Sequence, residues 1–225
     1  MISIVMPTLN EERNIEGAIQ NVSTLKGDFE LIVVDGGSTD KTVEIAGNHG
    51  TVIVSDKGRA KQMNAGARRA KGDILFFLHA DCRLSPHALS EIERSLNGNK
   101  EIVGGAFKFH LDDDSLLFKL LAFFSDFRAG ISKTFTGDFG LFVRRSAFDK
   151  IGGFNEIELM EDVDICRRLK KEGKLVQANA KIISSSRRFK KEGVLKTWTH
   201  MLVNRSLYSI GTSPTRLSKF YKEVR

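Results

Sequence analysis

ELIVVDGGSTD, residues Glu30 to Asp40, joins a continuous apolar run to an acidic residue, two glycines and a pair of helix-capping side chains. The apolar run ends at Asp35 and predicts a strand that is buried on both faces, as strands of parallel sheets are. Thr39 or Asp40 can cap a helix that continues to Ala46. The stretch therefore predicts a strand, a loop and a helix in succession, which is the repeating unit of an α/β fold.

The same alternation continues on both sides of this stretch. Apolar runs predict strands at residues 2–6, 51–55 and 73–80, and apolar spacing predicts helices at 11–25 and 59–71. Strand–helix alternation of this kind indicates a Rossmann-like, mostly parallel sheet flanked by helices.

The second half of the chain is less regular and is expected to be an α+β extension of the same sheet. Strands are predicted at 102–110 and within 137–145, and helices at 87–96, 116–127, 161–171 and 194–210. Residues 116–127 form an apolar stripe, which predicts packing in the core or, as an alternative, a lid or a membrane-facing surface. We expect one domain over residues 1–190 and a basic helical tail over 191–225, packed on it or beside it.

Composition excludes several classes of protein. The chain has 225 residues, of which 41% are hydrophobic and 28% charged, unlike disordered, collagen-like or disulfide-framework proteins. Cys82 and Cys166 are far apart, so reduced thiols are expected. The sequence shows neither a secretory signal nor an apolar run long enough to span a bilayer, and a cytoplasmic location is expected.

Charge is distributed unevenly along the chain. The net charge is +7, but residues 167–225 carry 16 Lys and Arg against 3 Asp and Glu. Such a segment can meet nucleic acid, an anionic membrane or phosphorylated ligands, or can simply be solvated helix surface. We expect an anionic surface at the inner face of the cell membrane, with Leu195, Trp198, Met201 and Leu202 on one apolar side.

Acidic and polar residues follow three of the predicted strands. Glu11 follows the first strand, Asp35 ends the second, and His79 and Asp81 follow the fourth. Ligands of open α/β sheets bind at this edge, and crowded carboxylates need a cation between them. The chain lacks the G-x-G-x-x-G, P-loop, H-E-x-x-H and G-x-S-x-G motifs, so dinucleotide enzymes, P-loop proteins and several hydrolases are disfavoured.

Four motifs in order resemble the inverting family 2 glycosyltransferases of GT-A fold. They are PTLNEE (7–12), VVDGGSTD (33–40), FLHAD (77–81) and GGF followed by MEDVDICRRL (152–169). TGDFGLFVRR (136–145) and SSRRF (185–189) are more narrowly similar to the bacterial radical-SAM/selenodomain-associated transferase 2 subgroup. The resemblance implies a nucleotide-binding half at 1–81 and an acceptor half at 82–190. It also implies transfer of a sugar, as in hexosyltransferases, from a UDP- or GDP-type donor to an acceptor hydroxyl, which could belong to a lipid-linked molecule.

The resemblance also implies roles for individual residues. Asp162 would be the catalytic base, and Asp81 would bind a divalent metal, Mn²⁺ or Mg²⁺. His79 replaces a second carboxylate and could also be a ligand, which would favour Mn²⁺. The remaining nucleotide-sugar positions would be Pro7, Leu9, Glu11, Asp35, Gly36, Arg59 and Ala80. Weaker candidates for acceptor or phosphate contacts are Asp138, Glu161, Arg187 and Arg188, and Asp164 is a further candidate for the base.

Three alternatives remain at this point. A sugar-phosphate nucleotidyltransferase has a similar sheet but needs a basic loop after the first strand, where this chain has the acidic PTLNEE. A nucleic-acid-binding module would explain the basic tail, although the tail has no stacking motif and no nucleic acid is expected. A non-catalytic relative of the fold that only binds a partner would explain His79, although an intact Asp162 argues against it.

Overall fold

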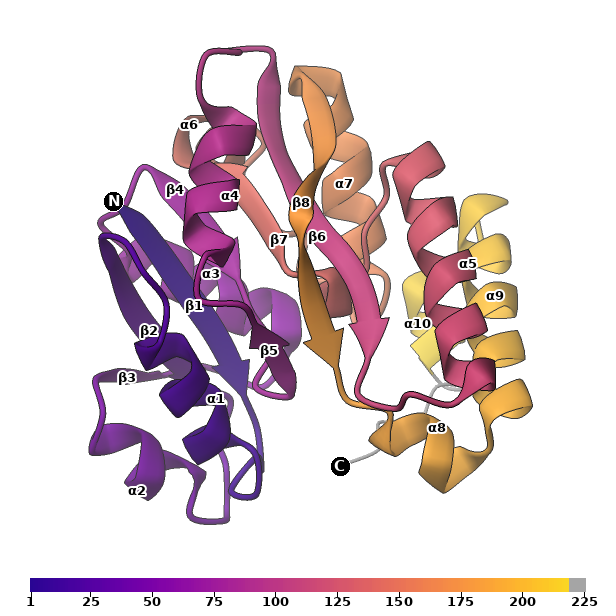
Figure 1. Cartoon of the computed structure of the whole chain (residues 1–225), viewed down its shortest axis with the longest axis horizontal. Helices are drawn as coiled ribbons and strands as arrows, with labels where there is room; N and C mark the ends of the chain where they lie inside the picture. Colours follow the sequence, from indigo (N-terminus) through magenta and orange to yellow (C-terminus); the bar gives the residue numbers. More distant parts are fainter. Residues whose placement is uncertain (219–225) are drawn as a thin grey trace.

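The computed structural model describes residues 1–218, and its centre is one mixed sheet (Figure 1). The strands are β1 (Ile2–Thr8), β2 (Phe29–Asp35), β3 (Thr51–Val54), β4 (Ile74–Phe77), β5 (Cys82–Leu84), β6 (Ile102–Leu111), β7 (Leu141–Arg144) and β8 (Lys174–Ser184). Their order across the sheet is β3-β2-β1-β4-β7-β6-β8-β5. The first four are parallel, whereas β7 is antiparallel to both of its neighbours and β6 is parallel to β8. The predicted α/β class is confirmed.

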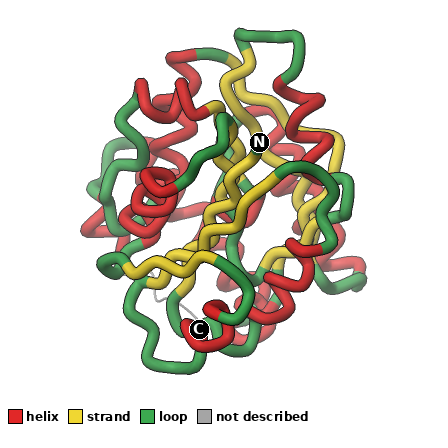
Figure 2. The backbone as a smooth tube through the Cα atoms, turned by 90° about the vertical axis from the view of Figure 1, so that its left-hand side faces the viewer, coloured by secondary structure: helices red, strands yellow, loops and turns green. Residues whose placement is uncertain are grey.

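Helices cover both faces of this sheet, which Figure 2 shows between two helical layers. One face packs on α1 (Ile15–Ser23), α2 (Thr42–Gly47) and α4 (Ala88–Leu96). The other packs on α3 (Arg59–Arg69), α5 (Leu116–Ser132), α6 (Arg145–Lys150) and α7 (Glu161–Glu172). Alternate residues of β1 serve the two faces: Ile4 packs on the α1 side and Val5 on the α3 side. This two-sided burial is why the predicted strands are continuous apolar runs.

The last part of the described chain packs beside α5. It contains α8 (Arg187–Glu192), α9 (Val194–Ser209) and α10 (Pro214–Ser218). Phe118 and Leu121 of α5 form one apolar cluster with Phe189 of α8 and with Trp198 and Met201 of α9. The remainder of the expected tail, residues 219–225, lies outside the described residues.

Several elements differ from the expectation. The helix expected from Glu11 begins only at Ile15, since residues 9–14 form a turn in which Asn10 has a φ of 54°. The strand expected to reach residue 80 ends at Phe77, and the short β5 follows it. The long strand β8 was not expected, because its sequence KLVQANAKIIS mixes polar with apolar residues.

Strand register brings the sequence motifs to one edge of the sheet. Thr8 of β1 lies opposite Asp35 of β2, and Val5 of β1 lies opposite Phe77 of β4. Helix α3 can approach this edge closely because Gly66 lacks a side chain: a Cβ there would lie 2.3 Å from Val5 Cγ1. The loops that follow β1, β2 and β4 therefore begin at neighbouring points, which is where ligands of open α/β sheets bind.

Candidate active site

A cavity of about 740 Å³ opens at this edge of the sheet. Its wall includes most of the predicted site residues, namely Pro7, Leu9, Glu11, Arg59, His79, Ala80, Asp81, Asp138, Glu161, Asp162, Arg187 and Arg188. They come from the end of β1 and the loop after it, from the loop after β4, from α3, from the turn before β7 and from the starts of α7 and α8. The fold thus brings together residues that are up to 181 positions apart in the sequence.

Asp35 and Gly36 are not among the lining residues of this cavity in the described part of the chain. Asp35 Oδ2 accepts hydrogen bonds from the backbone N–H groups of Gly37 and Ser38, both at 2.8 Å, and only 2% of the residue is exposed. A Cβ on Gly36 would lie 2.9 Å from the side chain of Gln62. Here both residues shape the loop behind the cavity, and their expected contact with a nucleobase stays a prediction.

His79, Asp81 and Asp138 form a cluster that could hold a metal ion. One ligand atom from each of the three lies within 4.8 Å of the other two, and His79 Nδ1 is 3.4 Å from Asp138 Oδ1. Asp81 and His79 were the predicted metal ligands, whereas Asp138 was expected only as a weaker acceptor contact. One imidazole and two carboxylates make a nitrogen–oxygen donor set that fits Mn²⁺.

The charges in this cluster depend on one another. Burial raises the pKa of Asp81, and the nearby negative charge of Asp138 raises it further. Burial would also raise the pKa of Asp138, but the hydrogen bond and positive charge of His79 outweigh burial and lower it. For His79 burial favours the neutral ring, and the interaction with Asp138 outweighs burial and raises its pKa. A surplus of negative charge therefore remains on Asp81, where a cation would relieve it.

The absence of a side chain at Gly137 leaves the space that the His79 ring occupies. Gly137 begins the short 3-10 turn η1 (Gly137–Phe139), and a Cβ at this position would lie 2.3 Å from His79 Cε1. Side-chain atoms essentially never approach so closely, so any other residue at 137 would displace the imidazole ring.

Asp162 is the second residue of α7, and the helix begins after Met160, whose φ is 70°. Its Oδ2 accepts a hydrogen bond of 3.0 Å from the backbone N–H of Gly137, and its Oδ1 accepts one of 2.7 Å from the N–H of Val163. Burial raises the pKa of Asp162, although these two hydrogen bonds favour the ionised form. The carboxylate is thus fixed in direction at the cavity wall.

Glu161, the neighbour of Asp162, is more deeply buried, with 4% of the residue exposed. Burial and the charge of Asp162 raise its pKa to about 7, although Arg59 Nη1 lies 3.8 Å from its Oε1 and opposes the shift. Asp164, the other candidate, is held by the Arg168 guanidinium at 2.8 Å and by the Asn155 side chain at 2.9 Å. Asp164 therefore braces the loop before α7 and is not on the cavity wall.

Arginine side chains supply positive charge around the cavity. Arg187 Nη2 lies 3.8 Å from Glu11 Oε1, and Arg188 pairs with Glu192 at 3.3 Å. Arg128 of α5 and Arg205 of α9 also line the cavity, and the sequence did not identify them. Nothing in their local sequence separates them from solvated charges on a helix, because their approach depends on how α5 and α9 pack.

Residues 3–152 match the model of glycosyl transferase family 2. The chain belongs to this family. It is similar to PGL/p-HBAD biosynthesis glycosyltransferase of Mycobacterium bovis, with 40% identity over 90 residues that cover 36% of this chain and 35% of that protein. Glycosyltransferase AglE of Haloferax volcanii is 29% identical over 170 residues, which cover 68% of this chain and 55% of AglE. This family 2 chain thus matches about a third to a half of the length of these relatives.

Solved glycosyltransferases show the same fold as this family 2 chain. The mannosyltransferase PcManGT from Pyrobaculum calidifontis, in complex with GDP-Man and Mn²⁺, has a TM-score of 0.67 at 18% identity, covering 81% of this chain and 56% of its own. S. aureus TarS 1-349, in complex with UDP-GlcNAc, has a TM-score of 0.64 at 16% identity, covering 82% of this chain and 58% of its own. The predicted glycosyltransferase fold is thereby confirmed.

Proposed function

We propose that this chain is an inverting glycosyltransferase that moves a sugar from a nucleoside-diphosphate sugar to an acceptor hydroxyl. The observation that carries the proposal is that one cavity contains both a metal-type cluster and a buried, oriented carboxylate, Asp162. Membership of family 2 and the GDP-Man and UDP-GlcNAc complexes of PcManGT and TarS support a donor of this kind.

In this proposal Asp162 accepts the proton of the acceptor hydroxyl as the oxygen attacks the anomeric carbon. Attack on the face opposite the leaving group inverts the configuration at that carbon. Arg59, on the first turn of α3, stabilises the diphosphate that leaves. His79, Asp81 and Asp138 would hold a divalent ion, which supplies further positive charge to the diphosphate.

The donor is proposed to lie against Pro7, Leu9, Glu11, Ala80 and Asp81, all on the cavity wall. We also assign the chain to the radical-SAM/selenodomain-associated subgroup, since both motifs of that resemblance contribute to the cavity. TGDFG supplies Gly137 and Asp138, and SSRRF supplies Arg187 and Arg188.

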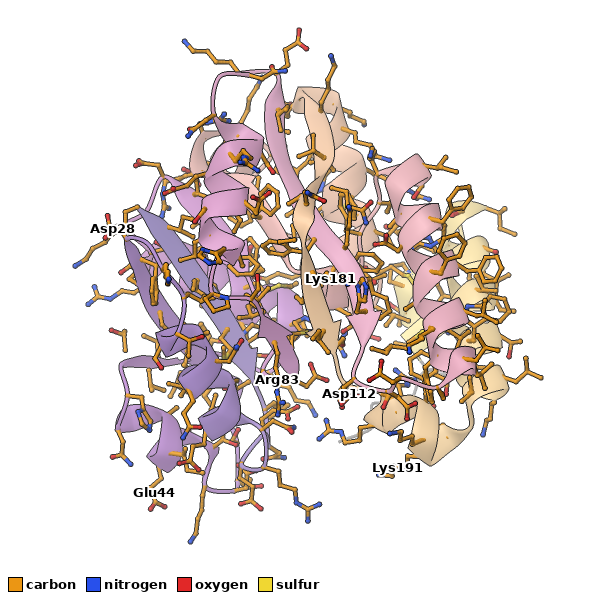
Figure 3. The ribbon with its side chains drawn as sticks, in the orientation of Figure 1. Asp28, Glu44, Arg83, Asp112, Lys181 and Lys191 are labelled. Atoms are coloured by element: carbon orange, nitrogen blue, oxygen red, sulfur yellow. The ribbon has the colours of Figure 1, made fainter. Side chains whose placement is uncertain are left out.

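We propose that the enzyme is cytoplasmic and binds peripherally to an anionic membrane, with a lipid-linked acceptor. Within residues 1–218, no helix combines the length and the apolar composition that crossing a bilayer needs. Phe123, Phe124 and Phe127 of α5 are more than half exposed, and so are Leu195 and Val203 of α9. Figure 3 shows aromatic side chains along the side of α5 that is turned away from the sheet.

Charge favours a bilayer over a second copy of the chain as the occupant of this apolar face. Residues 193–218 contain no Asp or Glu, and the one acid of α5, Asp126, accepts hydrogen bonds from Phe109 N–H and the Gln177 side chain. Lys196 remains exposed beside the apolar side chains, and so does Lys119, whose ammonium also pairs with Asp114 at 3.3 Å just before α5. A second copy would bring like charges together, whereas an anionic bilayer attracts them. The contact would thus include α5, although the sequence pointed first to the basic tail.

The decisive test of the transferase is a thermal-unfolding screen with UDP and GDP, each with Mn²⁺ or Mg²⁺. A ligand present at 100 times its dissociation constant should add about 2.7 kcal/mol to the free energy of unfolding. Asp81→Ala should abolish the gain, and Asp56→Ala, an exposed carboxylate away from the cavity wall, should retain it. Release of pyrophosphate from a nucleoside triphosphate and a sugar phosphate would instead identify a nucleotidyltransferase.

A further inference from the structure

Two arginines from different helices meet at the wall of the cavity. Arg128 Nη1 and Arg205 Nη2 both donate to the carbonyl oxygen of Thr134, at 3.2 and 3.3 Å. Both side chains are half-buried, and both belong to the cavity lining. Because the two guanidiniums share one acceptor atom, their positive charges lie close together in a partly dehydrated place.

Two neighbouring positive charges repel each other unless an anion lies between them. Burial, and then the charge of Arg205, lower the pKa of Arg128 to about 10. The pKa of Arg205 is also lowered, chiefly by burial, and Asp162 opposes the shift in both arginines. Asp162 is the carboxylate that opposes the shift in both arginines, and one carboxylate beside Arg128 and Arg205 leaves a net positive charge next to the proposed base.

The surroundings of the pair separate it from the proposed donor position. Arg128 and Arg205 belong to α5 and α9, whereas the donor residues follow β1 and β4 or begin α3. On the same two helices the wall includes the apolar side chains of Leu121, Trp198 and Met201 together with the polar Ser125 and Asn204. An anion bound there would therefore be attached to the molecule that Asp162 deprotonates, and not to the nucleotide.

We propose that Arg128 and Arg205 form a subsite for a phosphate group carried by the acceptor. Paired guanidiniums match the oxygens of a phosphate, and charge-assisted hydrogen bonds of this kind are about twice as strong as neutral ones. This inference rests on the proposed function, because only a transferase has an acceptor. Binding of the phosphate can nevertheless be measured without any sugar transfer. The phosphate could come from a lipid headgroup or from a small phosphorylated metabolite, and the test separates these sources.

The test is calorimetric titration of the full chain with farnesyl phosphate, farnesol and glycerol 3-phosphate. Trp198, the single tryptophan, lines the cavity and reports occupancy by its fluorescence. Farnesyl phosphate should bind at least about tenfold more tightly than farnesol, because farnesol lacks the charged group. A lipid source predicts weak binding of glycerol 3-phosphate, and a small-metabolite source predicts that it binds as tightly as farnesyl phosphate.

Arg128→Gln and Arg205→Gln should each weaken the phosphate-bearing ligand by about tenfold or more while leaving farnesol affinity unchanged. The matched control is Arg167→Gln, since that guanidinium bonds to Ser209 and lies over Tyr208 outside the cavity wall. Should a glutamine variant fail to fold, Arg128→Lys is the alternative. It keeps the positive charge but loses the planar guanidinium that can donate two parallel hydrogen bonds, so its affinity for farnesyl phosphate should be intermediate. UDP and GDP affinity should stay unchanged in all variants.

Two results would overturn the subsite. One is equal binding of farnesyl phosphate and farnesol together with undetectable binding of glycerol 3-phosphate. The other is a loss of UDP or GDP affinity in Arg128→Gln and Arg205→Gln as large as in Asp81→Ala, which would assign the pair to the donor diphosphate. Intact nucleotide binding with no phosphate preference would reject the subsite alone and leave the proposed transferase standing.

Discussion

The backbone N–H of Gly137 donates a 3.0 Å hydrogen bond to Oδ2 of Asp162, which connects the proposed base to the metal-type cluster. Gly137 directly precedes Asp138, and its Cα faces the ring of His79. One tight turn therefore sets both the direction of the base and the position of two candidate metal ligands. A disturbance of this turn should affect proton transfer and metal binding together.

Gly137→Ala should weaken Mn²⁺ binding. The added Cβ would lie 2.3 Å from His79 Cε1, so the imidazole has to leave the cluster. Displacing groups that orient a metal ligand typically costs about 10–100-fold in metal affinity. Calorimetric titration with Mn²⁺ measures the effect, and Gly17→Ala on α1, with no atom within 4 Å of the new Cβ, is the control. Mn²⁺ affinity equal to that of the unmodified chain would show that His79 is not a ligand.

Mn²⁺ should support turnover better than Mg²⁺, because an imidazole suits the softer ion. His79→Asp restores a third carboxylate to the cluster and should shift the preference toward Mg²⁺. Initial rates of nucleoside-diphosphate release at matched concentrations of the two ions give the ratio for each protein. Equal rates in EDTA and in Mn²⁺ would contradict a role for metal altogether.

Asp162→Asn should lower turnover strongly while nucleotide affinity changes little. Asparagine keeps the shape of the side chain but cannot accept the proton, and a positioned base typically contributes about 10²–10⁴-fold in rate. Nucleoside-diphosphate release measures turnover, and calorimetry with UDP or GDP measures affinity. The control is Asp164→Asn, whose carboxylate is held by Arg168 away from the cavity wall. Near-normal turnover in Asp162→Asn would move the role of base to Glu161 or Asp138.

Much of this site could be predicted from sequence because its parts follow buried strands. Asp81 and Glu11 lie in the loops that follow such strands, and a parallel sheet aligns those ends. Asp138 was expected only as a weaker acceptor contact, since only the antiparallel pairing of β7 with β4 brings its turn to His79. Arg128 and Arg205 were missed because their meeting depends on the packing of two helices.

The apolar stripe of α5 could be predicted from the sequence, but which of its residues are buried could not. Periodicity predicts that one side of a helix is apolar, but it does not say whether another element covers that side. Phe118 and Leu121 are buried against α8 and α9, whereas Phe123 and Phe127 of the same helix are 61% and 59% exposed. For α9, Trp198 and Met201 join the buried cluster, although they were expected on one apolar side with Leu195. Only the packed structure separates the two groups.

Glu161→Gln should stabilise the chain more at pH 8 than at pH 5. The pKa of Glu161 is raised from 4.5 to about 7, so the protonated carboxyl favours the folded state. The protonated carboxyl contributes fully to the free energy of unfolding below pH 4.5. This contribution is about 3 kcal/mol and is lost as the pH rises from 4.5 through 7. Glutamine resembles the protonated form at every pH and avoids the loss. Urea unfolding in EDTA at both pH values checks this, with the exposed Glu156→Gln as control. An equal effect at the two pH values would contradict the raised pKa.

Replacing the exposed rings of α5 should release the chain from anionic vesicles. Phe123 and Phe127 stack at 6.2 Å between ring centres and do not support the core, so Phe123→Ser with Phe127→Ser should leave thermal unfolding nearly unchanged. Each ring that no longer enters the lipid should lower partitioning by roughly tenfold, because burial of a phenyl group is worth that much. Sedimentation with phosphatidylglycerol-containing and pure phosphatidylcholine vesicles measures the partitioning at low and at physiological salt.

Val54→Ser, at the opposite end of the sheet and 73% exposed, is the matched control. Unchanged binding of the double variant would return the contact to the basic tail. The chain could instead form a dimer that the same double substitution dissociates, and show no vesicle binding. That result would show that a second copy of the chain covers this face despite the like charges.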